Sequence, residues 1–309
     1  MSPGRTRHQG LCPGRLAEMS ATLLLASAHA GTADEEAVEV ARAALSEAGA
    51  CEVVTTGTPE ELDAALDGAG RRRLVVAGGD GSLHLVVQHL HRRGELDEAD
   101  LALVPLGTGN DLARALDIPL DPLAAAELAL QGTPRPIDLV VDDEGGVTVN
   151  AVHLGIGAEA AQRSARLKGL LGPLAYPLGA VAAGFRSTGT QLRVEVDGDV
   201  LVDDRVLMVG IANGPGIGGG TALHPRAVVD DGLVDVMVST ATGPFARVRF
   251  GAALQGGSVL DDPDVRSARG REVVVRGGPV EVNSDGELGD TCDGRTWRVV
   301  PGAWRLVRP

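Results

Sequence analysis

Two glycine-rich segments hold the residues of this chain whose types and spacing could do chemistry. One reads Gly-Gly-Asp-Gly-Ser over residues 78–82, and the other reads Gly-Thr-Gly-Asn-Asp over residues 107–111. Glycine lets backbone N–H groups come close to phosphate oxygens, and the N-terminus of a following helix favours negative charge. The aspartate in each segment would repel a bare phosphate, so it fits best beside a cation such as Mg²⁺. Together the segments predict a nucleotide-phosphate site, although a lone Gly-Gly-Asp-Gly could also be a tight turn.

A third candidate, Asp285-Gly286-Glu287, lies late in the chain between strand-like residues and a polar turn. A carboxylate there could serve as a general base toward a hydroxyl, provided that the fold brings it back to the glycine segments. An ordinary hairpin turn explains the same residues equally well, and both interpretations stay open.

Two further patterns imitate known sites. Residues 155–160 resemble a dinucleotide fingerprint, but no acidic residue follows between Glu159 and Glu195, where the ribose contact would be needed. His84, Gln88 and His91 share one face of a helix without a fourth metal ligand. We interpret that face as solvated.

Composition narrows the functional classes. The 309 residues carry a net charge of −14, which argues against a nucleic-acid partner. The single lysine, Lys168, excludes a Walker loop and a protein-kinase lysine, so any phosphoryl transfer must use another architecture. Cys12, Cys51 and Cys292 lack metal-ligand spacing and indicate a reduced, cytoplasmic environment.

The first 20 residues predict a disordered extension. Basic residues precede a short apolar run that begins near residue 21, so a secretory signal is an alternative, but we favour a core strand over 22–27. The chain has no run of the ~18 apolar residues that a membrane span requires.

The elements that must position the glycine segments alternate between strands and helices. Strands are expected at 22–27, 51–55, 74–77 and 101–106, and helices at 34–48, 59–66, 83–92, 111–116 and 122–130. This order predicts a parallel sheet covered on both faces, with ligands at the carboxyl ends of its strands. Both glycine segments fall at such ends.

Beyond residue 138 the pattern changes to strands separated by turns, which predicts a second, mainly antiparallel domain. Strands are expected at 147–154, 191–196, 200–211, 233–239, 272–275 and 280–283, and helices at 158–184 and 245–254. Within the first of these helices, basic residues precede apolar ones from 163 onward, an order that suits a lipid surface as well as a core helix.

The two glycine segments and their neighbours resemble the signature of the diacylglycerol kinase catalytic domain family, which includes soluble bacterial lipid kinases and the sphingosine and ceramide kinases. The likeness continues, in the same order, through 135–139, 150–157, 213–220, 231–235 and 285–287, and so covers nearly the whole chain after residue 20.

The resemblance implies an α/β nucleotide-binding domain over 21–138 together with 297–309, a β-rich lipid-substrate domain over 139–296, and an active site in the cleft between them. It implies an ATP- and Mg²⁺-dependent kinase of a membrane lipid such as diacylglycerol, in transient contact with the inner membrane face, and it allows a homodimer. The implied ATP-binding residues are Gly31, Gly78, Gly79, Asp80, Gly81, Ser82, Gly107, Thr108, Gly109 and Asn110. Asp80, Asp111 and Asp138 would organise Mg²⁺ through water, and Glu287 would be the catalytic base acting with Asp80.

The chain departs from the family near its first strand. Residues 26–31 read Ala-Ser-Ala-His-Ala-Gly where Asn-Pro and Ser-Gly are usual, so Gly31 is the one clear phosphate-side contact that survives. Two alternatives therefore stay open. One is a kinase of a soluble substrate, as in NAD kinases, which share Gly-Gly-Asp-Gly. The other is a nucleotide- or lipid-binding regulator without catalysis.

Overall fold

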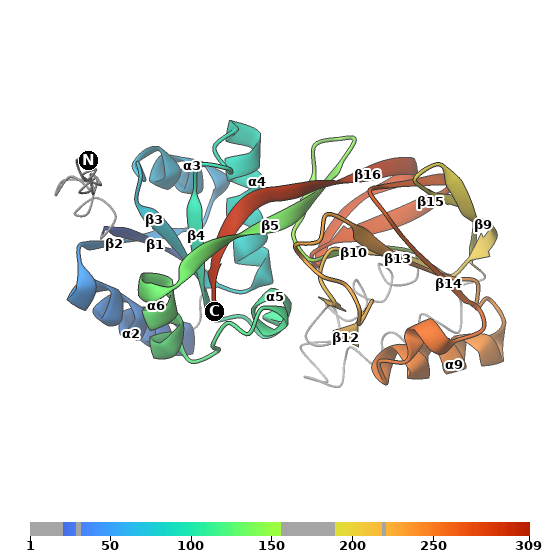
Figure 1. Ribbon diagram of the computed structural model, residues 1–309, viewed down its shortest axis with the longest axis horizontal. Helices are drawn as coiled ribbons and strands as arrows, with labels where there is room; N and C mark the ends of the chain where they lie inside the picture. Colours follow the sequence, from blue (N-terminus) through green and yellow to red (C-terminus); the bar gives the residue numbers. More distant parts are fainter. Residues whose placement is uncertain (1–20, 29–31, 156–188, 218–220) are drawn as a thin grey trace, which may run out of the picture.

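The computed structural model describes residues 21–28, 32–155, 189–217 and 221–309. These residues form an α/β domain and a mainly antiparallel β domain, which two long strands connect (Figure 1). The predicted fold class is confirmed.

The α/β domain is built around four parallel strands in the order β4, β3, β1, β2. Each expected strand and helix of this part is present within a few residues. The elements are β1 (Thr22–Ser27), α2 (Thr32–Ala48), β2 (Cys51–Thr56), α3 (Pro59–Asp67), β3 (Arg73–Gly78), α4 (Asp80–Arg93), β4 (Asp100–Pro105), α5 (Asp111–Ala115) and α6 (Pro122–Gln131).

Alternating side chains of β1 show how the helices cover this sheet. Leu23 and Leu25 are buried in one core with residues of α3 and α4, whereas Leu24 and Ala26 are buried in another with residues of α2 and α6. Both faces of a parallel sheet are thereby removed from water, as its βαβ connections require. The carboxyl edge of the strands is left for binding.

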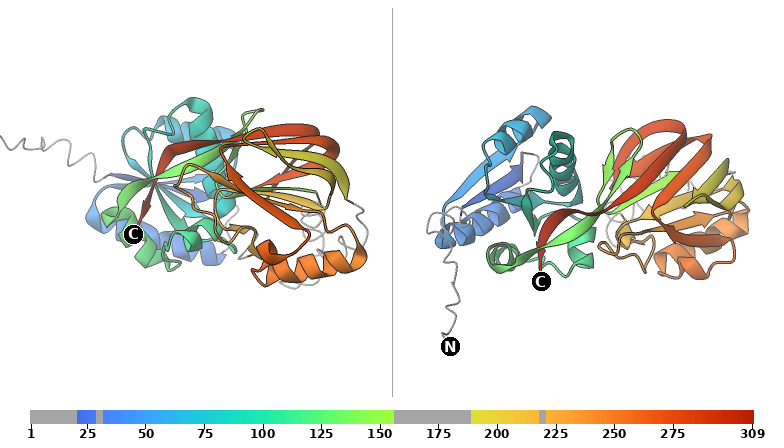
Figure 2. Two further views of the ribbon diagram at one scale, coloured as in Figure 1. Left: turned by 45° about the vertical axis from the view of Figure 1, so that its right-hand side comes forward. Right: turned by 45° about the horizontal axis from the view of Figure 1, so that its top comes forward.

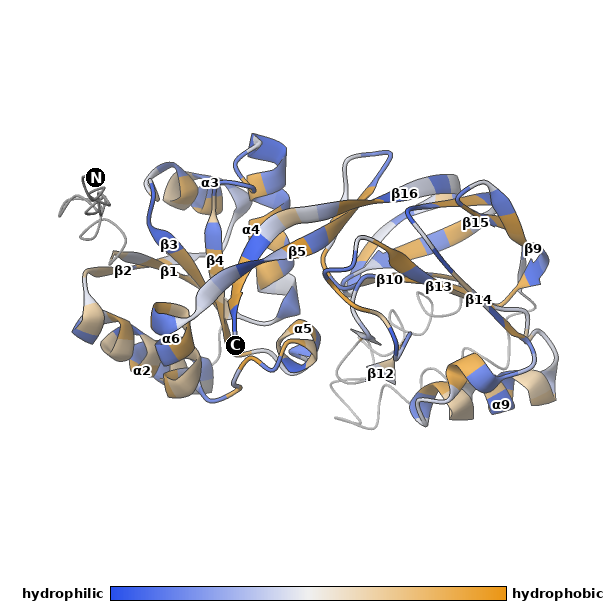
Figure 3. Cartoon of the chain, viewed as in Figure 1, coloured by the Kyte–Doolittle hydropathy of each residue, from blue (hydrophilic) through white to orange (hydrophobic). Residues whose placement is uncertain are grey.

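In its described residues, the second domain contains antiparallel strands, one α-helix and a 3₁₀ turn. Its elements are β6 (Val147–Thr148), β7 (Ala151–Gly155), β8 (Thr190–Val196), β9 (Asp199–Val206), β10 (Met208–Ala212), β11 (Gly216–Ile217), β12 (Thr221–Ala222), β13 (Val234–Ser239), α9 (Pro244–Gln255), the 3₁₀ turn η2 (Val259–Asp261), β14 (Val265–Gly270) and β15 (Glu272–Ser284). Valine dominates the core between its strands, and much of β13, which lies next to the edge strand β14, is coloured as hydrophobic in Figure 3.

Two long strands, β5 (Thr133–Asp142) and β16 (Glu287–Arg308), run from one domain into the other (Figure 2). β16 pairs with β15 in the second domain, with β5 along the connection, and with β4 at Arg305 and Leu306. One hydrogen-bonded sheet therefore continues through both domains. Trp297 and Trp304 of β16 are buried, and the pairing of β16 with β4 brings the end of the chain to the first domain.

Several predicted strands of the second domain were wrong in their limits. The expected strand at 147–154 is interrupted after Thr148, and the one at 200–211 is interrupted at Leu207, whose N–H donates to the Ser239 carbonyl (2.7 Å). The expected strands at 272–275 and 280–283 are one strand, β15, with an irregularity between Arg276 and Val280. β14 and the full length of β16 were not expected, because their sequences are polar and rich in arginine.

Some expectations lie outside the described residues. These are the extension over 1–20, Gly31, the helix at 158–184 and most of the fingerprint-like segment after Gly155. Across the described ranges, no helix is both long and apolar enough to cross a membrane.

Candidate active site

The two glycine segments meet, as the sequence predicted. Gly78 ends β3 and Gly79 caps α4, while residues 106–109 connect β4 to α5. A Cβ placed on Gly107 would lie 2.6 Å from the Gly79 Cα, and one placed on Gly79 would lie 2.9 Å from the Gly107 Cα. The loops therefore touch backbone to backbone, and each of these glycines is needed for its small size.

Asn110 closes the second loop on itself. Its Oδ1 accepts the Gly107 N–H (3.0 Å), and its Nδ2 donates to the Gly107 carbonyl (2.7 Å). The residue is buried and has a φ of 51°, a left-handed conformation that asparagine tolerates better than most residues. Thr108, at the tip of the loop, is exposed, and Gly109 is partly buried.

Asp80 of the first loop holds the helix that follows the second. Its two carboxylate oxygens accept the N–H groups of Asp111 (3.0 Å) and Leu112 (3.2 Å), the first residues of α5. The first turn of a helix has N–H groups without intrahelical partners, so a carboxylate is a natural cap. Asp80 therefore fixes the two loops relative to each other.

Negative charge gathers around Asp80. Burial raises the pKa of its carboxyl group, the two backbone hydrogen bonds lower it, and the charges of Asp111 and Asp285 raise it again, with a net upward shift. Asp111 is itself buried and lies beside Gly216 of the second domain. Within the described ranges no three histidine, cysteine or acidic side chains cluster closely enough to hold a metal by themselves.

Asp285-Gly286 forms the two-residue turn between β15 and β16, and it also brings Glu287 to the first glycine loop. Asp285 and Gly286 have φ values of 50° and 93°, and Ser284 pairs with Glu287 across the turn. The Glu287 Oε1 lies 3.7 Å from where a Cβ on Gly81 would be. The fold therefore brings residue 287 back to the glycine segments, which the sequence could not show. The exposed carboxylate of Glu287 in the second domain lies against the first turn of α4 in the first domain.

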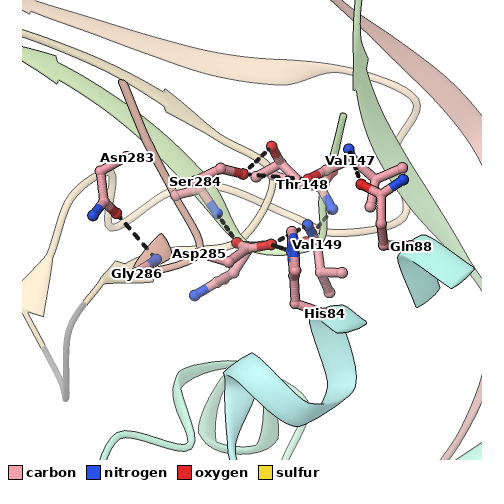
Figure 4. Close-up of polar contacts among 12 residues, drawn as sticks. His84, Gln88, Val147, Thr148, Val149, Asn283, Ser284, Asp285 and Gly286 are labelled. Atoms are coloured by element: carbon pink, nitrogen blue, oxygen red, sulfur yellow. Dashed lines mark hydrogen bonds and ion pairs between the residues drawn. The ribbon is translucent and has the colours of Figure 1, made fainter. Parts of the chain in front are cut away.

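Asp285 anchors this turn (Figure 4). Its carboxylate accepts three successive backbone N–H groups, from Val149 (2.7 Å), Asn150 (2.8 Å) and Ala151 (3.0 Å). Its Oδ2 also lies 2.9 Å from the Nδ1 of His84, a residue of α4 in the other domain. These contacts explain why the expected strand at 147–154 is interrupted, because its N–H groups turn toward the carboxylate.

The interpretation of the His84 helix face as solvated was wrong. His84 and Gln88 are buried, and His91, the third member, is partly buried. The Gln88 Oε1 accepts the Val147 N–H (3.0 Å), and its Nε2 donates to the Gly145 carbonyl (3.2 Å). The polar face of α4 is therefore matched to polar backbone of the second domain, which no property of the helix sequence alone could indicate.

Asp138 has a different set of partners. One carboxylate oxygen accepts the Gly232 N–H (2.6 Å) and the other accepts the Gly302 N–H (2.7 Å). Its backbone carbonyl accepts from the side chains of Asn213 and Trp304, both at 3.1 Å. These bonds make Asp138 a junction of β5, β16 and the turn before β13, and its role at a metal stays a prediction.

A cavity of about 160 Å³ lies at the carboxyl ends of β1, β2 and β3. Ser82, the last residue of the Gly-Gly-Asp-Gly-Ser segment, lines one part of it. Apolar side chains from the strands and from α4 make up most of the remaining wall, and Thr56–Pro59 and His89 also contribute. Sequence reasoning missed His89 and this turn, because neither carries a motif.

Two family models match the chain. Residues 21–141 match the diacylglycerol kinase catalytic domain, and residues 150–308 match the YegS C-terminal NAD kinase beta sandwich-like domain. A protein of Pseudomonas aeruginosa named "Probable lipid kinase YegS-like" is 39% identical over 91% of this chain and 92% of its own length. The chain belongs to the YegS-like lipid kinase family. A protein of the same name from Stenotrophomonas maltophilia is 35% identical over 76% of this chain and 78% of its own length.

Solved structures share the fold of this YegS-like family member. A structure described as a diacylglycerol kinase from Bacillus anthracis has a TM-score of 0.71 at 18% identity, covering 94% of this chain and 98% of its own. A second structure from that organism has a TM-score of 0.79 at 20% identity and covers 99% of both chains. The predicted family and two-domain architecture are confirmed, and the enzyme class is that of a kinase.

Proposed function

We propose that this YegS-like family member is an ATP- and Mg²⁺-dependent lipid kinase that phosphorylates a hydroxyl of a membrane lipid such as diacylglycerol. The observation that carries this proposal is the contact between Glu287 and Gly81. It sets a general-base candidate beside the loop whose backbone N–H groups are suited to phosphate. The names of the relatives support the lipid as substrate.

The residues around Asp80 fit a divalent cation. Burial and, to a smaller extent, two acidic neighbours raise the pKa of its carboxyl group, so a positive charge there would relieve the repulsion among these carboxylates. Mg²⁺ prefers oxygen ligands, keeps several waters, and binds proteins through one or two carboxylates plus substrate phosphates. Asp80 and Asp111 would hold the ion in this way. When bound, it would neutralise charge on the transferred phosphoryl group.

Different residues of the chain then have different roles in the reaction. The loop glycines and Ser82 bind the ATP phosphates, and Glu287 removes the proton of the lipid hydroxyl. The hydroxyl oxygen forms a bond to the γ-phosphorus while the bond from that phosphorus to the β–γ bridging oxygen breaks, which gives a phospholipid and ADP. Phosphoryl transfer depends on alignment and charge neutralisation, so no lysine is required. Access to a lipid substrate calls for transient contact with a bilayer.

Labelled ATP, Mg²⁺ and vesicles containing diacylglycerol test the proposal, with NAD and a total lipid extract as parallel substrates. Glu287→Gln should lower kcat by about 10²–10⁴-fold and leave the KM for ATP nearly unchanged. Asp80→Asn should impair both parameters and weaken the dependence on Mg²⁺. Asp290→Asn, the same chemical change at an exposed carboxylate on the same strand, is the matched control and should retain wild-type rates.

Three outcomes would contradict parts of this proposal. Wild-type kcat in Glu287→Gln would remove Glu287 as the base. Label transferred to NAD and to no lipid would replace the lipid kinase with a kinase of a soluble substrate. Tight ATP binding without turnover on any substrate would favour a regulator.

A further inference from the structure

His89 is a buried polar residue that the proposed reaction does not use. It lies on α4, is 7% exposed, and lines the cavity at the ends of β1, β2 and β3. Its Nδ1 lies 2.8 Å from the Oδ1 of Asp63 on α3. The opposite ring nitrogen, Nε2, makes no hydrogen bond within the part of the chain that the structure describes. A histidine oriented by a carboxylate on one side and open to a cavity on the other resembles a ligand contact.

The cavity has the layout that a nucleoside needs. The stripe of α4 that faces it is Ser82, Leu85, Val86 and His89, at the helical spacing i, i+3, i+4 and i+7. Ser82 belongs to the phosphate loop, and His89 lies two turns, or about 10 Å, further along the helix axis. The cavity is also lined by the apolar side chains of Leu25, Leu62 and Val76. An apolar wall of this kind suits the flat faces of a base.

The Asp63 carboxylate decides which hydrogen-bonding group His89 offers. The hydrogen bond from His89 is the largest influence that lowers the pKa of Asp63, so the carboxylate is ionised and can only accept. The proton of the neutral ring therefore sits on Nδ1. Nε2 is left with a lone pair, so the ring of His89 can offer an acceptor to a ligand in the cavity that it lines.

We propose that His89, held by Asp63, binds the 6-amino group of adenine and gives this kinase its preference for ATP over 6-oxo purine nucleotides. This inference rests on the proposed function, since it takes the cavity as the pocket for the base. An exocyclic amine donates to Nε2. The 6-oxo group of guanine or hypoxanthine is an acceptor, so it would leave two buried acceptors facing each other without a proton. The cost of such an unpaired buried group corresponds to about tenfold to a hundredfold in affinity.

Calorimetric binding of ADP and inosine diphosphate tests this idea without requiring turnover. The bases of the two ligands differ at the 6-position. ADP has an amine there, whereas inosine diphosphate has an oxo group and a proton on the neighbouring ring nitrogen. At pH 8 the wild-type protein should bind ADP at least about tenfold more tightly than inosine diphosphate. His89→Phe keeps the ring and its packing but lacks the acceptor, so it should bring the two affinities together mainly by weakening ADP.

Three further variants separate this role from a structural one. His89→Gln offers an amide oxygen and should restore part of the preference. Asp63→Ala lets the proton move between the two nitrogens and should reduce the preference. Leu85→Ala, which removes an apolar part of the same wall, should weaken both ligands by similar factors and keep their ratio.

The outcomes distinguish this inference from the proposed function. An ADP preference unchanged in His89→Phe, or a wild-type preference for inosine diphosphate, would overturn the role of His89. Failure of the folded wild-type protein to bind either nucleotide would instead contradict the nucleotide site itself.

Discussion

The contact between His84 and Asp285 offers a test of how the two domains are joined. Removal of the imidazole in His84→Ala deletes a hydrogen bond to a carboxylate whose side chain is only 2% exposed. Hydrogen bonds to charged groups contribute about 1.5–3 kcal/mol. Breaking a buried ion pair costs more when the remaining charge is left without partners, but Asp285 keeps three backbone donors. We therefore expect a loss of about 2–3 kcal/mol in the free energy of unfolding at pH 5.5.

The effect should depend on pH in a defined direction. Burial lowers the pKa of His84, but the hydrogen bond and charge of Asp285, aided by the charge of Glu287, outweigh it and raise the pKa above its ordinary value. A raised folded-state pKa contributes stability that is fully present below the unfolded value, about 6.5, and is lost as the pH rises through the folded value. The gap between wild type and His84→Ala should consequently be larger at pH 5.5 than at pH 9.

Urea unfolding of both proteins at several pH values measures this gap. Leu85→Ala, an exposed substitution on the same helix that removes no titrating group, is the control and should shift stability equally at all pH values. Because Asp285 also anchors the turn that carries Glu287, His84→Ala should lower kcat by about tenfold to a hundredfold with little change in the KM for ATP. A stability gap that is constant with pH, or one that widens toward pH 9, would refute the reasoning.

Two further substitutions test other contacts. Gly107→Ala should lower stability by about 1–3 kcal/mol and weaken ATP binding in calorimetry, because its Cβ would lie 2.6 Å from the Gly79 Cα. The control is Gly251→Ala in helix α9, where a Cβ would have no such neighbour within 4 Å. It should instead stabilise the chain by about 0.5–1 kcal/mol. Equal melting temperatures for the two variants would argue against the close contact of the loops. Asp138→Ala should lower stability by about 3 kcal/mol in urea unfolding because two glycine N–H groups lose their acceptor, and a loss below about 1 kcal/mol would mean that Asp138 does not hold the junction.

The first domain could be read from the sequence because its signals are local. Apolar runs of strand length alternate with capped helices, and Thr58 with Glu61 forms the capping box that the helix at Pro59 requires. The meeting of the two glycine loops also follows from topology, because adjacent parallel strands bring their carboxyl ends to one edge. No distant contact is needed for either inference.

The second domain was harder to predict because its strands depend on distant partners. β16 contains Gly289, Asp290, Asp293 and Gly294 near its beginning, residues that favour turns, yet it pairs with β15 through this region. Tertiary pairing overrides local propensity there. The same holds for α4, whose histidine and glutamine look solvated on a helical wheel but face two acceptors, the Gly145 carbonyl and the Asp285 carboxylate, and one donor, the Val147 N–H.

The turn at Asp285-Gly286-Glu287 shows why a motif alone could not separate structure from chemistry. Its two carboxylates lie two residues apart. A hairpin turn and a catalytic base are both reasonable interpretations of this tripeptide. In the structure the two residues have different surroundings. Asp285 is enclosed by four donors and holds the turn in place, whereas Glu287 is exposed and lies against Gly81. Four donors occupy the Asp285 carboxylate, whereas the Glu287 carboxylate is open to a substrate, so we propose Glu287 and not Asp285 as the base. The anchoring of the first carboxylate is what holds the second within reach of the other domain.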